Sequence, residues 1–140
     1  MPAFKLPPVR SGRAAVATVE FAMLMPLLLL LFVVAVDFTR IFYLSITLTN
    51  CAEAGALYGC ADPVKANDTG GIKTAALKDA TNVNPSAITV ASATDSASTP
   101  TYVDVTVSCP FQSITGLIGV PQSITVSRKT RMKVSPWTPG

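Results

Sequence analysis

Residues 21–36 read FAMLMPLLLLLFVVAV, a run of 16 residues without a charge. At about 1.5 Å per residue, a helix over this run spans about 24 Å of the roughly 30 Å hydrocarbon core of a bilayer. The uncharged residues 14–19 before it and Phe38 after it extend the run to a full span. The stretch therefore predicts a membrane-spanning helix.

The flanks of this run predict its orientation. Residues 1–13, MPAFKLPPVRSGR, carry three basic residues, no acid and three prolines. The positive-inside rule places this basic end in the cytoplasm and the C-terminal hundred residues outside. A cleaved secretory signal is the alternative, but the small residues of its cleavage pattern are missing directly after the run, where the sequence is VVAVDFTRIFYL. We therefore expect a retained anchor.

The rest of the chain predicts an α+β fold. Apolar and small residues recur at helical spacing beyond Asp37, so one helix is expected from near Ala14 to Tyr58. Its end is rich in small residues, which pack either inside the domain or against another subunit. A loop at 62–71 and a short amphipathic helix at 72–80 follow. Three strands then form an antiparallel sheet, from alternation at 88–90, 102–109 and 123–134, with residues 91–100 as a flexible connection.

These elements give a division of the chain into four parts. Residues 1–15 are a basic leader and 16–60 are the transmembrane and extended helix. Residues 61–135 form an extracytoplasmic α+β domain, and 136–140 are a tail. A length of 140 residues suits one folding unit of this kind.

Composition argues against several classes of function. The sequence has no histidine, which excludes serine–histidine triads and histidine-based zinc sites. A net charge of +3, without one dense basic patch, does not indicate nucleic-acid binding. Asp68-Thr69-Gly70 resembles the triplet of aspartic proteases, but it has no second copy and is better explained as turn chemistry. We expect no enzymatic activity, no metal and no cofactor.

Three cysteines follow the anchor, in the part expected to lie in an oxidising compartment. In an intact helix Cys51 and Cys60 are about 13 Å apart, too far for a disulfide. Cys109 must then take one of them, and Cys60 at the helix exit is the freer partner. We predict a Cys60–Cys109 disulfide, which leaves Cys51 as a buried thiol or as the link in a covalent dimer.

Charged residues bracket the apolar run. An acid at the depth of Glu20 is costly in lipid unless it meets a cation, and this makes it a candidate functional residue; the alternative is a hydrated residue at the interface. Asp37 and Arg40 are spaced to pair on the helix surface, which predicts an ion pair of modest value.

The segment GRAAVATVEFAMLMPLLLLLFVVAVDFTRIFYLSITLTNCAEAGALYG resembles the N-terminal segment of TadE-like proteins, pilin-like components of the bacterial tight adherence pilus. The resemblance rests on Val19-Glu20-Phe21, on Pro26 within the helix, on Asp37-Phe38 with Arg40, and on two motifs near the helix end, Leu48-Thr49-Asn50 and Ala54-Gly55-Ala56. The later stretch 103–132 also resembles the closing strands of the family.

The resemblance implies processing by a prepilin peptidase, with the glutamate fifth from the new N-terminus. Counting back from Glu20 places the cut between Ala15 and Val16, although the family's leader usually ends in glycine and Gly12 lies three residues earlier. The free amine of one subunit can then pair with the Glu20 carboxylate of its neighbour, since two charges that are costly in lipid neutralise each other.

These observations lead to two hypotheses for the function. The first is a minor pilin or pseudopilin in the bacterial inner membrane, which helps to assemble or initiate the pilus. Its partners would be the membrane, the prepilin peptidase, other pilus subunits and the assembly platform. The second is a bitopic envelope protein whose extracytoplasmic domain binds a ligand or partner, with the helix only as an anchor.

Overall fold

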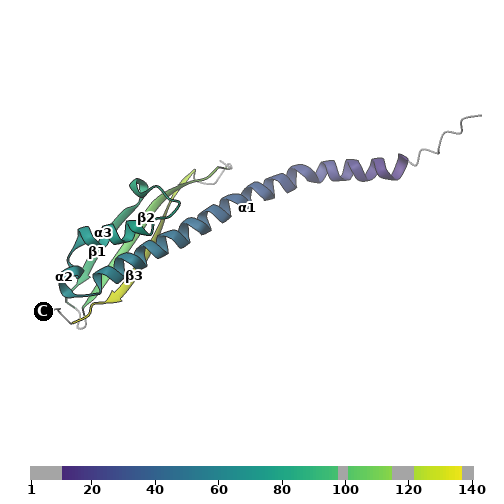
Figure 1. Ribbon diagram of the computed structural model, residues 1–140. Coiled ribbons are helices and arrows are strands. Elements are labelled where there is room, and N and C mark those ends of the chain that lie inside the picture. The colour runs from purple at the N-terminus through teal and green to yellow at the C-terminus, as the bar shows by residue number, and fades with distance from the viewer. Residues whose placement is uncertain (1–10, 98–100, 115–121, 137–140) are drawn as a thin grey trace, which may run out of the picture. The chain divides into compact units, whose positions relative to one another are not determined.

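The computed structural model describes residues 11–97, 101–114 and 122–136, with side chains from Ala15 onward. The chain divides into two compact units, Met1–Val36 and Asp37–Gly140, which we call the N-terminal unit and the C-terminal unit. Helix α1, Ser11–Gly59, runs through both (Figure 1). Its bounds agree with the long helix that the sequence predicts.

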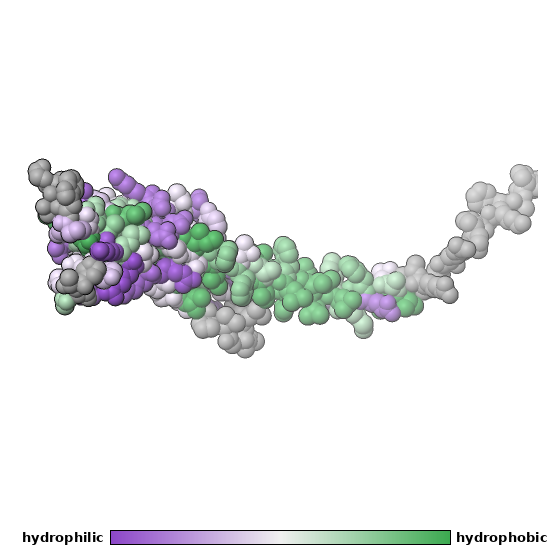
Figure 2. All heavy atoms as spheres, turned by 90° about the horizontal axis from the view of Figure 1, so that it is seen from below, coloured by the Kyte–Doolittle hydropathy of each residue, from purple (hydrophilic) through white to green (hydrophobic). Residues whose placement is uncertain are grey.

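The N-terminal unit presents an apolar helical surface. Nearly all side chains from Ala15 to Val36 are exposed, and Pro26 lies inside the helix. Figure 2 shows that the surface of this part of α1 is mostly hydrophobic. The helical stretch Ala15–Gly59 is long and apolar enough to cross a membrane. It contains an 18-residue segment with a mean hydropathy of 2.6, none of which is buried. A soluble monomer rarely exposes a patch of this extent, so the surface indicates a membrane anchor.

The C-terminal unit contains a three-stranded antiparallel sheet in the order β1-β2-β3. The strands are β1 at Thr89–Asp95, β2 at Tyr102–Gln112 and β3 at Ser123–Lys133. Pairing runs from Tyr102 opposite Lys133 to Gln112 opposite Ser123. With α1 and short helices beside this sheet, the α+β prediction is confirmed.

The core lies between α1 and one face of β2. Residues Val103, Val105 and Val107 are fully buried, and α1 meets them with small residues. A Cβ placed on Gly55 would lie 3.2 Å from a methyl of Val105, and one on Gly59 would lie 3.2 Å from a methyl of Val103. The small residues at the helix end therefore pack inside the domain, which settles the choice that the sequence leaves open.

The prediction of a loop over 62–71 is wrong, because two aspartates start helices there. The Asp62 carboxylate accepts a hydrogen bond from the Lys65 amide at 2.7 Å and begins α2, Pro63–Ala66. The Asp68 carboxylate accepts from the Gly71 amide at 2.9 Å and begins α3, Thr69–Lys78. N-caps of this kind satisfy amides that the first helical turn leaves unpaired, so the two glycines enter α3.

The connection predicted over 91–100 is also partly wrong. Strand β1 runs to Asp95, paired residue by residue with β2 from Ser108 to Tyr102. Backbone pairing makes the strand although its side chains are small and polar, since the ladder needs only amides and carbonyls. Residues Pro85–Ala87 form a short 3-10 helix, η1, before it. The tail residues 137–140 and leader residues 1–10 lie outside the described residues.

Candidate functional site

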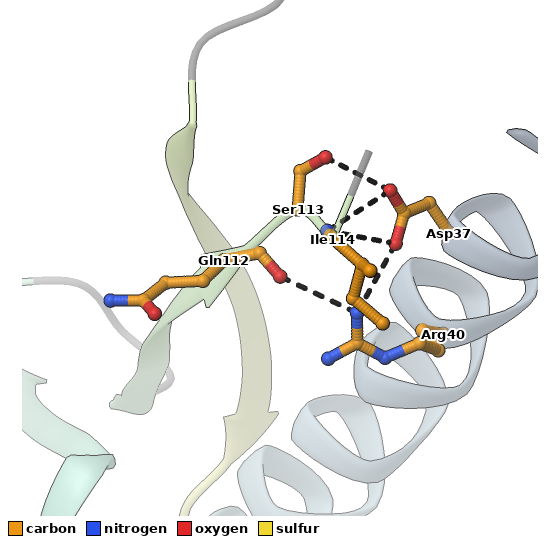
Figure 3. Close-up of polar contacts among 5 residues, drawn as sticks. All are labelled: Asp37, Arg40, Gln112, Ser113 and Ile114. Carbon is orange, nitrogen blue, oxygen red and sulfur yellow. Dashed lines mark hydrogen bonds and ion pairs between the residues drawn. The ribbon is translucent and has the colours of Figure 1, made fainter. Parts of the chain in front are cut away.

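Asp37, the first residue of the C-terminal unit, is the most connected acidic residue of the resemblance motif. Its carboxylate accepts a hydrogen bond from the Ser113 hydroxyl at 2.9 Å. The backbone amide of Ile114 approaches both carboxylate oxygens at 3.2 Å (Figure 3). Although it is charged, Asp37 is only 7% exposed. These contacts join α1 to the residues that follow β2.

Arg40 lies one turn further along α1 and completes the arrangement. Its Nη1 atom is 3.1 Å from Asp37 Oδ1 and 3.5 Å from the carbonyl oxygen of Gln112. Its guanidinium carbon lies 5.1 Å from the centre of the Phe111 ring, within the range of a cation–π contact. We call Asp37, Arg40, Ser113 and the Ile114 amide the Asp37 clamp.

The ion pair that the sequence predicts between Asp37 and Arg40 is confirmed, with Arg40 Nη1 and Asp37 Oδ1 3.1 Å apart. The pair is a surface pair only on its Arg40 side, where the side chain is 43% exposed. Asp37 is buried, and removing its partners would leave a carboxylate without its donors, which is costly. The clamp holds the end of the β2 strand to α1. Its groups pair with one another, which makes it a structural connection rather than a site for chemistry.

The candidate residues of the N-terminal unit all lie on α1. Ala15 and Val16, on either side of the predicted cut, are exposed, and so are Glu20, Phe21 and Pro26. The cut would fall within the helix, four residues after its first residue, Ser11. Their roles in processing and assembly remain predictions.

The predicted Cys60–Cys109 disulfide is absent, because both residues are free thiols. The Cys60 carbonyl oxygen accepts a hydrogen bond from the Ser135 amide, whereas Cys109 pairs with Val126. Ser135 lies nine positions after Val126 in the sequence, roughly 20–30 Å in an extended strand, while a disulfide needs Cα atoms within about 7 Å. The prediction failed because α1 runs antiparallel to β2 and carries its end to the far end of the sheet.

Cys51 and Cys109 are buried in the core. Burial raises the pKa of both thiols, and for Cys51 the Asp79 carboxylate raises the pKa further. Both are therefore held as neutral thiols that pack as small apolar groups. For Cys51 this agrees with the buried-thiol alternative.

Several contacts were missed by sequence reasoning. The Ser45 hydroxyl accepts hydrogen bonds from the Arg128 guanidinium, with Nε at 2.9 Å, and the Tyr58 hydroxyl donates to Asp68 at 2.9 Å. Ser113 is a common residue after a strand, and nothing in its sequence context marks Asp37 as its partner. Among the described residues, no group of three or more Cys, Asp or Glu side chains is placed to hold a metal ion.

The comparisons with known proteins bear on one part of the chain. The model of the TadE-like protein family matches residues 15–57, which confirms the resemblance over this segment. The matched segment contains Glu20, Pro26, Asp37 and Arg40, and it ends before the sheet begins. A search of curated proteins finds no match to the chain, and a search of solved structures finds none either.

Proposed function

We propose that this chain, which carries a TadE-like segment at residues 15–57, is a structural subunit of the tight adherence pilus, a minor pilin or pseudopilin that acts in its assembly or initiation. It would lie in the bacterial inner membrane with its N-terminus in the cytoplasm. The C-terminal unit would face the periplasm or the exterior.

One observation carries this proposal most directly. The family-matched helix exposes apolar side chains from Val16 to Val36, and Glu20 is the only charged residue between Arg13 and Asp37. A carboxylate in lipid costs a few kcal/mol unless it meets a cation. A helix that served only as an anchor would be more stable without it. An acid at this position is better explained by a positive partner supplied by another subunit.

The partner that we propose is the free amine of a neighbouring subunit after removal of the leader. A prepilin peptidase would cut between Ala15 and Val16, which leaves Glu20 one helical turn from the new N-terminus. The amine and the carboxylate of adjacent subunits would then neutralise each other in a medium where each alone is costly. Assembly would become favourable through this pairing and through helix packing.

In the proposed function the Asp37 clamp would have a mechanical role. It begins one residue after the apolar run and ties the sheet to α1 at that position. A subunit held in a filament by its helix must transmit load to its exposed domain. The clamp would carry this load through charge-assisted hydrogen bonds at the base of the C-terminal unit.

N-terminal sequencing and intact-mass measurement of the protein extracted from its native membrane test the proposal. We expect a mature N-terminus at Val16, and the full-length mass in cells that lack prepilin peptidase. A start at Arg13 would move the cut to follow Gly12 and keep the proposal. A chain that begins at Met1 or Pro2 in peptidase-containing cells would contradict it and would favour a simple bitopic anchor.

A further inference from the structure

The charges of the β2–β3 hairpin are concentrated at one of its ends. Lys129 of β3 is paired with Asp104 of β2 at 2.9 Å, and Arg131 of β3 is paired at 2.7 Å with Asp95, which lies in the neighbouring strand β1. In the sequence, by contrast, no charged residue occurs from Val105 to Ser127. The end of the hairpin that approaches Asp37 therefore contributes no charge of its own.

This uncharged end exposes apolar side chains. Ile114, two residues after the end of β2, is 67% exposed, and Ile124 of β3, which pairs with Phe111, is 39% exposed. On α1, Phe38 and Phe42 are 74% and 67% exposed. We call Phe38, Phe42, Ile114 and Ile124 the apolar rim. Large apolar groups gathered on one end of a domain indicate a surface that is covered in use.

The clamp limits the depth in the membrane at which Ile114 can lie. Asp37 directly follows Val36, the last residue of the apolar run, and its carboxylate is bonded to the Ile114 amide. If residues 16–36 cross the hydrocarbon core, Asp37 lies at the outer boundary of that core. The Ile114 amide must then lie within a few ångströms of the same depth. Only the covalent link and these hydrogen bonds are needed for this placement.

We propose that the apolar rim is a second membrane-contacting surface, which enters the boundary between headgroups and acyl chains in the leaflet where α1 leaves the bilayer. Amphipathic surfaces seat at this boundary about 5–10 Å deep. Phe38 and Phe42 continue the span on the helix, and Ile114 and Ile124 add a contact from the hairpin. The Arg40 side chain at this depth can reach lipid phosphates while its stem stays in the apolar region.

The chemistry of the rim favours lipid over water as its environment. Its four side chains are purely hydrocarbon and uncharged, and the charged groups of the hairpin lie beyond it along the strands. The burial of apolar area away from water stabilises this seating. Two contacts, one from α1 and one from the hairpin, would fix the sheet against the membrane surface.

Tryptophan quenching in vesicles tests the proposal. The full chain with Trp137→Phe, which removes the one tryptophan of the sequence, receives Ile114→Trp and is reconstituted into vesicles of zwitterionic and anionic phosphatidyl lipids. The substitution keeps the amide that donates to Asp37. Leu24→Trp in the apolar run is the positive control. Val64→Trp in α2 is the matched negative control, since Val64 is an apolar residue of the C-terminal unit that is 75% exposed.

The three variants are compared with acyl chains brominated near the carbonyl end and near the middle. We expect Ile114→Trp to lose fluorescence mainly with bromine near the carbonyl end, Leu24→Trp to be quenched by both lipids, and Val64→Trp by neither. Equal, negligible quenching of Ile114→Trp and Val64→Trp would overturn the proposal. So would a blue-shifted but unquenched Ile114→Trp that varies with protein density, because a second copy would then cover the rim. Absence of quenching in Leu24→Trp would refute the span and the rim together.

Discussion

The Ser113 hydroxyl donates a hydrogen bond to the Asp37 carboxylate at 2.9 Å, although 76 positions of sequence separate the two residues. The contact closes the C-terminal unit, since its helical segment begins at Asp37 and the β2 strand ends at Gln112. Asp37 therefore links the family-matched segment to the residues that directly follow β2, which the family match does not cover. This relationship leads to the first prediction.

Asp37→Ala should destabilise the C-terminal unit by about 2–3 kcal/mol, because hydrogen bonds to a charged group are lost and their donors remain. Ser113→Ala should cost about 1 kcal/mol, and the double variant should cost less than the sum. Hydrogen exchange of the β2 and β3 amides in the detergent-solubilised full chain measures the opening free energy. Strict additivity would show that the two side chains do not interact.

Gly55→Val should destabilise the packing of α1 on β2. The Cβ atom alone would lie 3.2 Å from the Val105 methyl and 3.3 Å from the Ala76 methyl, so further methyls overpack the core by about 1–3 kcal/mol. Gly70→Ala is the control. Its Cβ meets nothing closer than 3.5 Å, and alanine is the better helix former by up to about 1 kcal/mol, so this variant should be stabilised. Hydrogen exchange of the β2 and β3 amides measures the change in opening free energy for both variants.

The cysteines should differ sharply in reactivity toward a thiol-alkylating reagent. Cys60 is partly exposed, while Cys51 and Cys109 are buried with raised thiol pKa values. We expect one fast alkylation at Cys60 in the native protein and three after unfolding without reductant. The reactive species is the thiolate, so burial and raised pKa act in the same direction. Peptide mapping that found a Cys60–Cys109 disulfide would contradict the strand register described above.

The stability of the C-terminal unit should fall in acid through its helix caps. The amide of Lys65 lowers the pKa of Asp62, and the amide of Gly71, followed by the hydroxyl of Tyr58, lowers the pKa of Asp68. A depressed folded-state pKa contributes stability above the unfolded-state pKa of about 4, and this stability is lost as pH falls through the folded-state value.

The double variant Asp62→Asn with Asp68→Asn isolates this effect. Asparagine caps helices about as well as aspartate but does not titrate, so the variant should lose less stability below about pH 4 than the native chain. Urea titration of the solubilised protein at a series of pH values gives the comparison. Identical pH profiles would exclude the two caps as the acid-sensitive groups.

Much of the fold follows from sequence pattern, and the failures have identifiable physical causes. The α1 helix and the buried face of β2 were predicted because their periodicities, helical spacing and strict alternation, are long and unambiguous. The loop at 62–71 was wrong because aspartate favours both turns and N-caps, and the outcome depends on which amide its carboxylate meets. The predicted strand at 88–90 was too short, because the pairing of β1 depends on the backbone of the neighbouring strand and not on the side chains of β1 itself.

The candidate site could be predicted only in part. Glu20 and Asp37 stand out because charges beside an apolar run are rare. The partners of Asp37 could not be found, since Ser113 and the Ile114 amide reach it only through the three-dimensional course of the hairpin. The cysteine pairing failed for the same reason. A helix can be placed from its own residues, but the end of the sheet that it meets depends on the fold.

The last prediction concerns Glu20 in assembly. If its carboxylate pairs with a neighbour's amine, Glu20→Ala should leave the monomer inserted, because removal of an acid lowers the insertion cost by a few kcal/mol. The same change should reduce both co-purification with pilus subunits and surface piliation. Glu53→Ala is a matched control, since Glu53 is the other glutamate of the chain and is exposed on α1 within the C-terminal unit.

Membrane abundance, co-purification and piliation are measured together for the two variants. We expect Glu20→Ala to have normal membrane abundance but reduced co-purification with pilus subunits and reduced piliation. Glu53→Ala should leave membrane abundance, co-purification and piliation unchanged. Normal piliation at normal abundance in Glu20→Ala would remove this residue from the mechanism. Loss of the Glu20→Ala protein from the membrane would instead assign the glutamate to folding or insertion, because a pairing role requires a monomer that inserts without it.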